Sequence, residues 1–141
     1  MMFYGQGYAG AGAGFGGGLH AARRYAAVHA GSRIDGASPH SLVKILFDEL
    51  LLSLDAAALA EGQGDRAKAS DKQARAMSIL HALESSLDFE RGGDIAVGLA
   101  QIYREARRLL LLGATERRPD HVEQAHAMIG EIAEAWERIG G

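Results

Sequence analysis

The chain has 141 residues, of which 48% are apolar, with only two prolines and no cysteine. Fifteen basic and eighteen acidic side chains leave a formal charge of -3, which is too balanced to indicate a nucleic-acid-binding or membrane-surface protein. The lack of cysteine excludes a disulfide framework and a thiolate zinc site, and it is compatible with a reducing cytoplasm. This length suits one domain, and the large share of alanine and leucine favours an all-α fold.

The first segment, MMFYGQGYAGAGAGFGGG (residues 1–18), contains eight glycines. Each glycine adds backbone entropy that folding would have to remove, so we expect a disordered tail. The N-terminal residues include no basic leader region, and glycines interrupt every apolar run. The sequence therefore predicts neither a signal peptide nor a membrane-spanning helix, and the expected location is the cytoplasm.

A short helix or arm is expected over residues 19–31, where the composition changes. Leu19, Ala22, Tyr25 and Val28 recur at helical intervals and share one face. At about twelve residues, such a helix is marginal alone and needs a surface to lie against.

Four longer helices should follow. Ser38 and Pro39 are typical of a helix start, because the hydroxyl caps free amides and proline lacks only an N–H that would be unpaired there. Asp65 and Asp94 are expected to cap the next two helices, and Pro119 suits the first turn of the last. The predicted helices span about residues 39–60, 65–87, 94–112 and 119–138, within one bundle domain over residues 19–141. Their short connections favour antiparallel neighbours, and so an up-down-up-down four-helix bundle.

The first and third of these helices have more apolar residues than one core-facing side requires. On the first, Glu49 and Ser53 separate the core face from a second apolar arc. This arc consists of Ile45, Leu52, Ala56 and Leu59. On the third, the core face begins at Ile95, while Leu111 and Leu112 fall towards the side of Arg104 and Arg108. The last helix has a core face that runs from Val122 to Ile139.

Two explanations remain open for these second arcs. They either widen the contacts with adjacent helices or form a groove for a further helix, and as a set they favour the groove. The occupant would be a helix of another protein or the arm of this chain.

Catalytic and metal sites are weakly indicated. Glu123 and His126 have the E-x-x-H spacing of di-iron bundles, but no second copy exists, so we expect an ordinary surface pair. The glycine-rich segment is not followed by Gly-Lys-Ser/Thr, which excludes a phosphate loop. His81 is followed by Glu84 rather than a nearby cation, which disfavours a phosphotransfer histidine. We therefore expect no enzyme activity, no metal and no cofactor.

Five arginines cluster near one end of the predicted bundle: Arg104, Arg107, Arg108, Arg117 and Arg118. A solvated face that offsets a helix C-terminus is favoured over contact with an anion or an acidic partner.

Five segments, in this order, resemble the FliS family of flagellin-specific secretion chaperones. They are YAAV (25–28), ASPHSLVKILFDEL (37–50), ERGGDIA (90–96), LAQIYREARRLLL (99–111) and AEAWERI (133–139). No single segment is diagnostic, but their order and spacing are specific. The sequence departs from the family pattern in LFDELLLSL, where a small residue commonly follows the aspartate, and at residues 111–114, which replace a more polar junction.

The resemblance implies an antiparallel four-helix bundle that binds the C-terminal segment of flagellin in the cytoplasm and prevents premature polymerisation. It also implies delivery to the cytoplasmic domain of the flagellar type III export gate, without nucleic-acid binding or direct membrane insertion. A weak homodimer is left open. The alternative function is a small helical regulatory adaptor that binds an amphipathic helix of another protein.

The candidate partner-binding residues come from the resemblance and from the second arcs. The resemblance implies that Tyr25 and Val28 belong to an arm that covers part of the groove and moves away when flagellin arrives. It assigns Gly92 and Gly93 to a turn rather than to binding. The complete candidate set is Tyr25, Val28, Ile45, Leu52, Ala56, Leu59, Tyr103, Arg107 and Leu111.

Overall fold

The computed structural model describes residues 38–140, and this part of the chain consists of four α-helices without strands. The helices are α2 (Pro39–Gly62), α3 (Arg66–Ser85), α4 (Phe89–Glu116) and α5 (Pro119–Gly140). The predicted all-α class is therefore confirmed. The predicted tail (1–18) and arm (19–31) lie outside the described residues.

Side-chain caps begin α2 and α3 at the predicted positions. The Ser38 hydroxyl accepts a hydrogen bond from the Ser41 amide at 3.1 Å, and Pro39 occupies the first turn. The Asp65 carboxylate accepts one from the Lys68 amide, also at 3.1 Å. Each cap satisfies an amide that the first helical turn leaves without a backbone partner.

The α4 helix starts earlier than predicted, at Phe89 rather than at residue 94. Asp88 is the N-cap, and its carboxylate accepts hydrogen bonds from the amides of Glu90 and Arg91 at 3.0 and 3.1 Å. Gly93 then interrupts the helix with φ 51° and ψ -130°, a backbone conformation that glycine tolerates far better than other residues. Gly93 thus separates one capped turn from the long regular part of α4, which begins close to the predicted residue 94.

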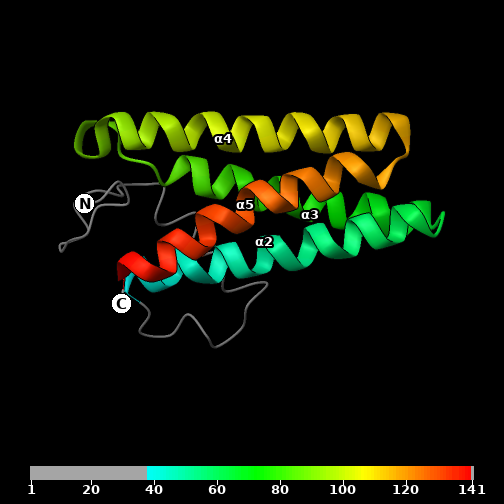
Figure 1. The fold of residues 1–141 in the computed structure, drawn as a ribbon, viewed down its shortest axis with the longest axis horizontal. Helices are drawn as coiled ribbons and strands as arrows, with labels where there is room; N and C mark the ends of the chain where they lie inside the picture. The colour runs from blue at the N-terminus through cyan, green and yellow to red at the C-terminus, as the bar shows by residue number, and fades with distance from the viewer. Residues whose placement is uncertain (1–37, 141) are drawn as a thin grey trace.

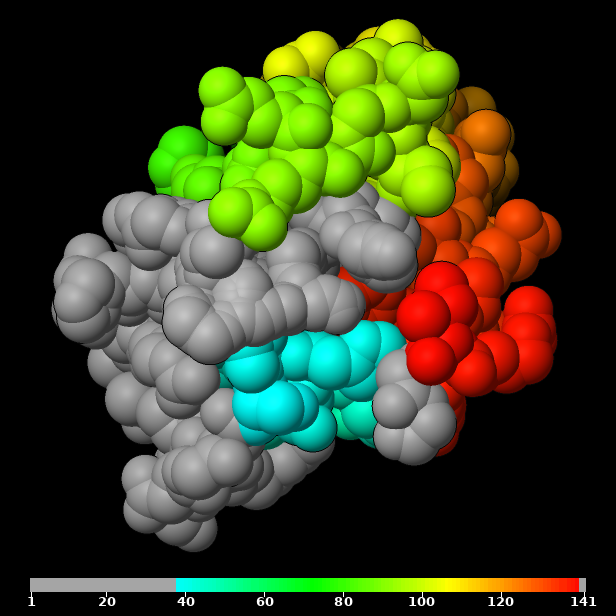
Figure 2. Space-filling view, turned by 90° about the vertical axis from the view of Figure 1, so that its left-hand side faces the viewer, coloured from blue at the N-terminus to red at the C-terminus, as the bar shows by residue number. Residues whose placement is uncertain are grey.

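The four helices form a closed ring in which each one contacts two others. Close backbone contacts join α2 to α3 and α5, and α4 to α3 and α5, while no such contact joins the diagonal pairs in the described part. The colours in Figure 1 run left to right along α2 and α4 and right to left along α3 and α5. Figure 2 shows the end of the bundle at which α2 begins and α5 finishes. Consecutive helices therefore run in opposite directions.

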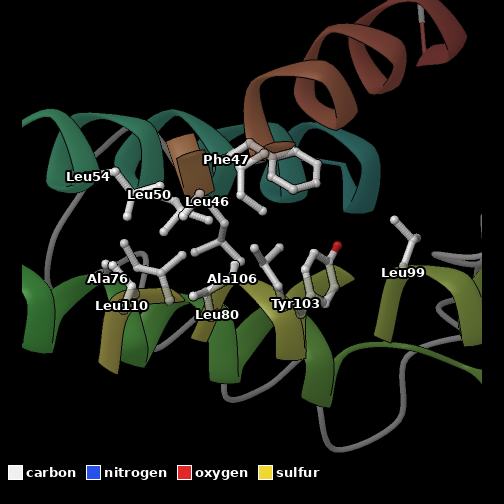
Figure 3. Close-up of a cluster of buried hydrophobic side chains, with 14 of the residues drawn as sticks. Leu46, Phe47, Leu50, Leu54, Ala76, Leu80, Leu99, Tyr103, Ala106 and Leu110 are labelled. Atoms are coloured by element: carbon white, nitrogen blue, oxygen red, sulfur yellow. The ribbon is translucent and has the colours of Figure 1, made fainter. Parts of the chain in front are cut away.

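The core lies along the inner faces of all four helices, and Figure 3 shows part of it. Leucines of α2 meet Leu80 of α3 and Leu110 of α4, and the ring of Tyr103 lies among them. The labelled side chains that are completely or almost completely buried are Leu46, Phe47, Leu50, Leu54, Ala76, Leu80, Tyr103, Ala106 and Leu110. Burying a leucine in this way contributes about 1.5–3 kcal/mol to folding.

The predicted core faces are too long at two helix ends. Ile95 near the start of α4 is 56% exposed, and Ile139 near the end of α5 is 58% exposed, although both positions continue the apolar pattern. In contrast, Gly113 lies inside α4 beyond the predicted end at residue 112. A Cβ atom at this glycine would lie 3.0 Å from Val122 Cγ2, so the small residue permits a close contact between α4 and α5.

Candidate partner-binding surface

The outward side of α2 exposes two large apolar side chains. Leu52 is 63% exposed and Leu59 is 61% exposed, whereas Leu50 and Leu54 on the inner side are completely buried. A spacing of seven residues is two helical turns, or about 10 Å, so both leucines lie on one side of the helix. Ala56 is half-buried between them. We call Leu52, Ala56 and Leu59 the α2 apolar stripe.

Acidic residues flank this stripe. Asp48 pairs with Lys44 at 3.1 Å, and Asp55 pairs with His126 of α5 at 3.2 Å. The Asp55 side chain is still 71% exposed, so its carboxylate is accessible to solvent. The α2 apolar stripe is thus apolar in its centre and anionic at its edge.

A hollow of about 460 Å³ opens beside the stripe, between the second half of α2 and the start of α5. Leu59 and Asp55 line it from α2, and Glu123 lines it from α5. The complete lining is Asp55, Ala58, Leu59, Gly62, Gln63, Pro119 and Glu123. Side chains and turn backbone from two helices therefore form one concave site, which we call the α2–α5 hollow.

The exposed leucine of α4 lies apart from this surface. Leu111 is 59% exposed, on the same side of α4 as the exposed Arg104 and Arg108. Because α2 and α4 occupy diagonal positions in the ring, their outward sides face in opposite directions. Leu52 and Leu59 of the first predicted arc and Leu111 of the second are exposed, whereas Ile45 is buried, and the fold does not bring the two arcs together.

The arginine cluster is divided among ion pairs with carboxylates. Arg104 and Arg107 both bind Glu84 of α3, at 3.1 and 2.6 Å. The remaining pairs are Arg108 with Glu105, Arg117 with Glu61 and Arg118 with Asp120. The hydrogen bonds from Arg108 and Arg118 lower the pKa values of Glu105 and Asp120. Every arginine of the cluster therefore has an anionic partner within the protein, although Arg104, Arg108 and Arg118 also remain exposed to solvent.

No metal-binding group forms among the described residues, where no three histidine or carboxylate side chains gather. Glu123 lines the hollow, while His126 pairs with Asp55 instead of acting with Glu123. His81 is exposed on α3. None of the four described helices is long and apolar enough to cross a membrane.

A family model described as "Flagellar protein FliS" matches residues 21–141, which is most of the chain. The chain belongs to the FliS family. The flagellar secretion chaperone FliS of Salmonella typhimurium is 34% identical over 118 residues, which cover 83% of this chain and 87% of the relative. FliS of Vibrio cholerae is 30% identical over 115 residues, which cover 82% of this chain and 85% of that relative. FliSB of Pseudomonas aeruginosa is 26% identical over 124 residues, which cover 86% and 96%.

Two of the candidate residues of this FliS-family chain lie inside the bundle. Tyr103 is completely buried in the core, and Ile45 is 6% exposed. In this conformation a partner could not reach either side chain, so both can influence binding only by shaping the surface. Arg107 is partly exposed and bound to Glu84. Tyr25 and Val28 lie outside the described residues.

Sequence reasoning missed the α2–α5 hollow of this FliS-family bundle. Asp55 lies three residues after Leu52 and four before Leu59, so a helical wheel of α2 places it beside the α2 apolar stripe. Glu123 and Pro119 join the hollow only because the start of α5 lies beside the end of α2. No local pattern in the sequence predicts that proximity.

Proposed function

We propose that this FliS-family protein is a cytoplasmic export chaperone that binds the C-terminal segment of flagellin. Binding prevents premature polymerisation, and the complex delivers its cargo to the flagellar type III export apparatus through the cytoplasmic domain of the export gate. The family membership and the chaperone names of the relatives support this proposal. The observation that carries it is the exposure of Leu52 and Leu59 on one side of α2.

The α2 apolar stripe is suited to a client that is disordered when free and helical when bound. Removing one leucine side chain from water contributes about 1.5–3 kcal/mol, before the cost of ordering the client is subtracted. Ordering a disordered segment consumes part of this gain, which favours reversible hand-over to the export apparatus rather than permanent capture. No chemical step belongs to this function.

The candidate residues take different roles in the proposal. Leu52, Ala56 and Leu59 make the main contact, and Leu111 belongs to a second contact on the opposite side of the bundle. Tyr25 and Val28 cover part of the groove until the client arrives. Ile45, Tyr103 and Arg107 support the shape of the contact surface.

The proposal is tested by titrating the full-length protein with flagellin and with flagellin that lacks about its last forty residues, a length typical of coupled folding and binding. We expect intact flagellin to bind, and we expect the affinity of the truncated flagellin to be at least about tenfold lower, a difference of about 1.4 kcal/mol. In the FliS-family protein, Leu52→Ser combined with Leu59→Ser should weaken the binding of intact flagellin to a similar degree.

Leu50→Ala is the matched control, because it removes a buried leucine of the same helix. It should lower the free energy of unfolding by about 2–5 kcal/mol, whereas the two exposed substitutions should change it by about 0.5 kcal/mol or less each. Wild-type affinity in the Leu52→Ser, Leu59→Ser variant would remove the α2 apolar stripe from the contact. Equal binding of unrelated amphipathic peptides would favour the adaptor function instead.

A further inference from the structure

Charge is distributed unequally between the two sides of the bundle. The adjacent helices α2 and α5 contain nine carboxylate side chains and two lysine or arginine side chains, a formal charge of -7. The helices α3 and α4 contain six carboxylates and eight cationic side chains, a formal charge of +2. The total charge of the protein conceals this asymmetry, which gives the α2–α5 side an attraction for cations.

The carboxylates of α2 each have a lysine, arginine or histidine partner, but α4 and α5 differ in how their charges are paired. On α4, the arginines at positions 91, 104, 107 and 108 each have a carboxylate partner. On α5, Glu123, Glu131 and Glu137 form no ion pair within residues 38–140. The positive charges of α4 are thus neutralised internally, while much of the negative charge of α5 faces solvent.

The α2–α5 hollow concentrates this negative charge beside an apolar surface. Asp55 and Glu123 supply two carboxylates, and its lining of seven residues includes no lysine, arginine or histidine, although His126 lies 3.2 Å from the exposed Asp55 carboxylate. Leu59 forms the apolar part of the same wall and continues towards Leu52. A ligand in the hollow would therefore contact apolar and anionic groups together.

Helix ends place partial charges of both signs beside the hollow. The α2 helix ends at Gly62 in the lining, and its last turn contains no basic residue of its own, although Arg117 pairs with Glu61 in that turn. The α5 helix starts in the same place with the opposite polarity. Its first residue, Pro119, contributes no N–H, and Asp120 and Glu123 counter the partial positive charge.

We propose that the α2 apolar stripe and the α2–α5 hollow together receive a cationic amphipathic helix of a partner protein. Its apolar residues cover Leu52 and Leu59, and a lysine or arginine reaches Asp55 and Glu123. The inference rests on the proposed function only in that both place a partner helix on the α2 apolar stripe. Charge complementarity favours this occupant, because a second copy of the chain in a two-fold symmetric contact would present the same acidic side and be repelled.

The test uses the full-length protein and three synthetic helical peptides with the same leucines. The peptides have lysine, glutamine or glutamate at the flanking positions, and binding is followed by fluorescence anisotropy at low and high salt. The lysine peptide should bind at least about tenfold more tightly than the glutamate peptide at low salt, and the difference should shrink as salt is added.

Charge-neutral variants locate the interaction. Asp55→Asn combined with Glu123→Gln should weaken the lysine peptide about three- to tenfold and leave the glutamine peptide unchanged. The matched control, Asp71→Asn combined with Asp94→Asn, changes the net charge equally at exposed carboxylates of α3 and α4. An equal loss of lysine-peptide affinity in the control variant would show attraction to the net negative charge of the protein instead of a site, and would overturn the inference. Equal affinities of the lysine and glutamate peptides for the wild type would also overturn it.

Two further measurements separate other occupants. Displacement of the lysine peptide by a synthetic peptide of residues 19–37 would assign the hollow to a segment of this chain. A concentration-dependent increase in mass that the Asp55→Asn, Glu123→Gln variant abolishes would assign it to a second copy. Either result overturns the proposal.

Parallel titration with the flagellin C-terminal segment keeps the two proposals distinguishable. Lysine-peptide binding with the predicted variant effects, but no flagellin binding, would contradict the proposed function alone. Flagellin binding without discrimination between the lysine and glutamate peptides would contradict this inference alone.

Discussion

At the scale of single residues, one aromatic pair joins the start of α2 to the end of α5. The imidazole of His40 stacks on the indole of Trp136, with ring centroids 4.3 Å apart and planes 8° apart. The indole N–H donates a hydrogen bond to the His40 carbonyl oxygen at 3.0 Å. Burial lowers the pKa of His40 below its ordinary value, because the charged ring would lose hydration.

This lowered pKa predicts that acidification weakens the fold at His40. The unfolded chain, with an ordinary histidine pKa of about 6.5, binds the proton more readily than the folded one. Stability should therefore be complete above this value and fall as the pH decreases towards the lowered folded pKa. Urea unfolding from about pH 7.5 to about pH 5 should show the wild type losing stability relative to His40→Phe, which retains an aromatic ring but does not titrate. The prediction would be contradicted if the difference in free energy of unfolding between the wild type and His40→Phe did not change with pH.

At the scale of secondary-structure elements, α4 shows how glycines can take opposite roles in one helix. Gly93 has a positive φ and interrupts the helix, whereas Gly98 lies in regular helix, where a Cβ atom would meet no other part of the described chain within 4 Å. The interruption lets the chain leave α3 through residues 86–88 and still begin α4 with a capped turn. The backbone conformation thus distinguishes two positions that look alike in the sequence.

The two glycines should respond oppositely to replacement by alanine. Gly93→Ala should lower the free energy of unfolding by about 1–3 kcal/mol, because alanine is strained at this φ and ψ. Gly98→Ala should raise it by about 0.5–1 kcal/mol, because alanine loses less backbone entropy in a helix. Chemical denaturation followed by far-UV circular dichroism measures both. Similar changes for the two variants would argue against the interruption at Gly93.

At the scale of the whole molecule, a buried carboxylate links α2 to the connection between α4 and α5. The Glu61 side chain is only 3% exposed, and its Oε2 lies 3.3 Å from Nη2 of Arg117. Arg117 ends α4 in a left-handed conformation, with φ 56° and ψ 44°. The pair therefore joins the end of α2 to the connection between α4 and α5, which lies far from it in the sequence.

Removing only one partner of this pair should destabilise the bundle. Arg117→Met leaves the Glu61 charge buried without a partner and should cost about 1–3 kcal/mol. The arginine is one third exposed, so solvent screening keeps the loss below that of a fully buried pair. Combining it with Glu61→Leu should restore much of the stability, as measured by urea unfolding. A double variant as unstable as Arg117→Met would show that packing of the arginine, and not its charge, supports this corner.

The amino-acid sequence alone was enough to predict the helical class and the caps that begin α2 and α3, and its matching segments indicated the FliS family. It also indicated that Leu52, Leu59 and Leu111 are surplus to the core. These features are local, because caps and helical periodicity depend on residues within a few positions of one another.

Which groups lie beside the surplus residues follows from the fold and not from the sequence of any one helix. The fold places Leu111 opposite the α2 apolar stripe, leaves Ile95 and Ile139 exposed near helix ends, and joins Asp55 with Glu123 at one hollow. It also gives each clustered arginine an acidic partner, two of them through Glu84 of another helix. Such contacts depend on which helices are neighbours and where each one ends, and the periodicity of one helix contains no information about either.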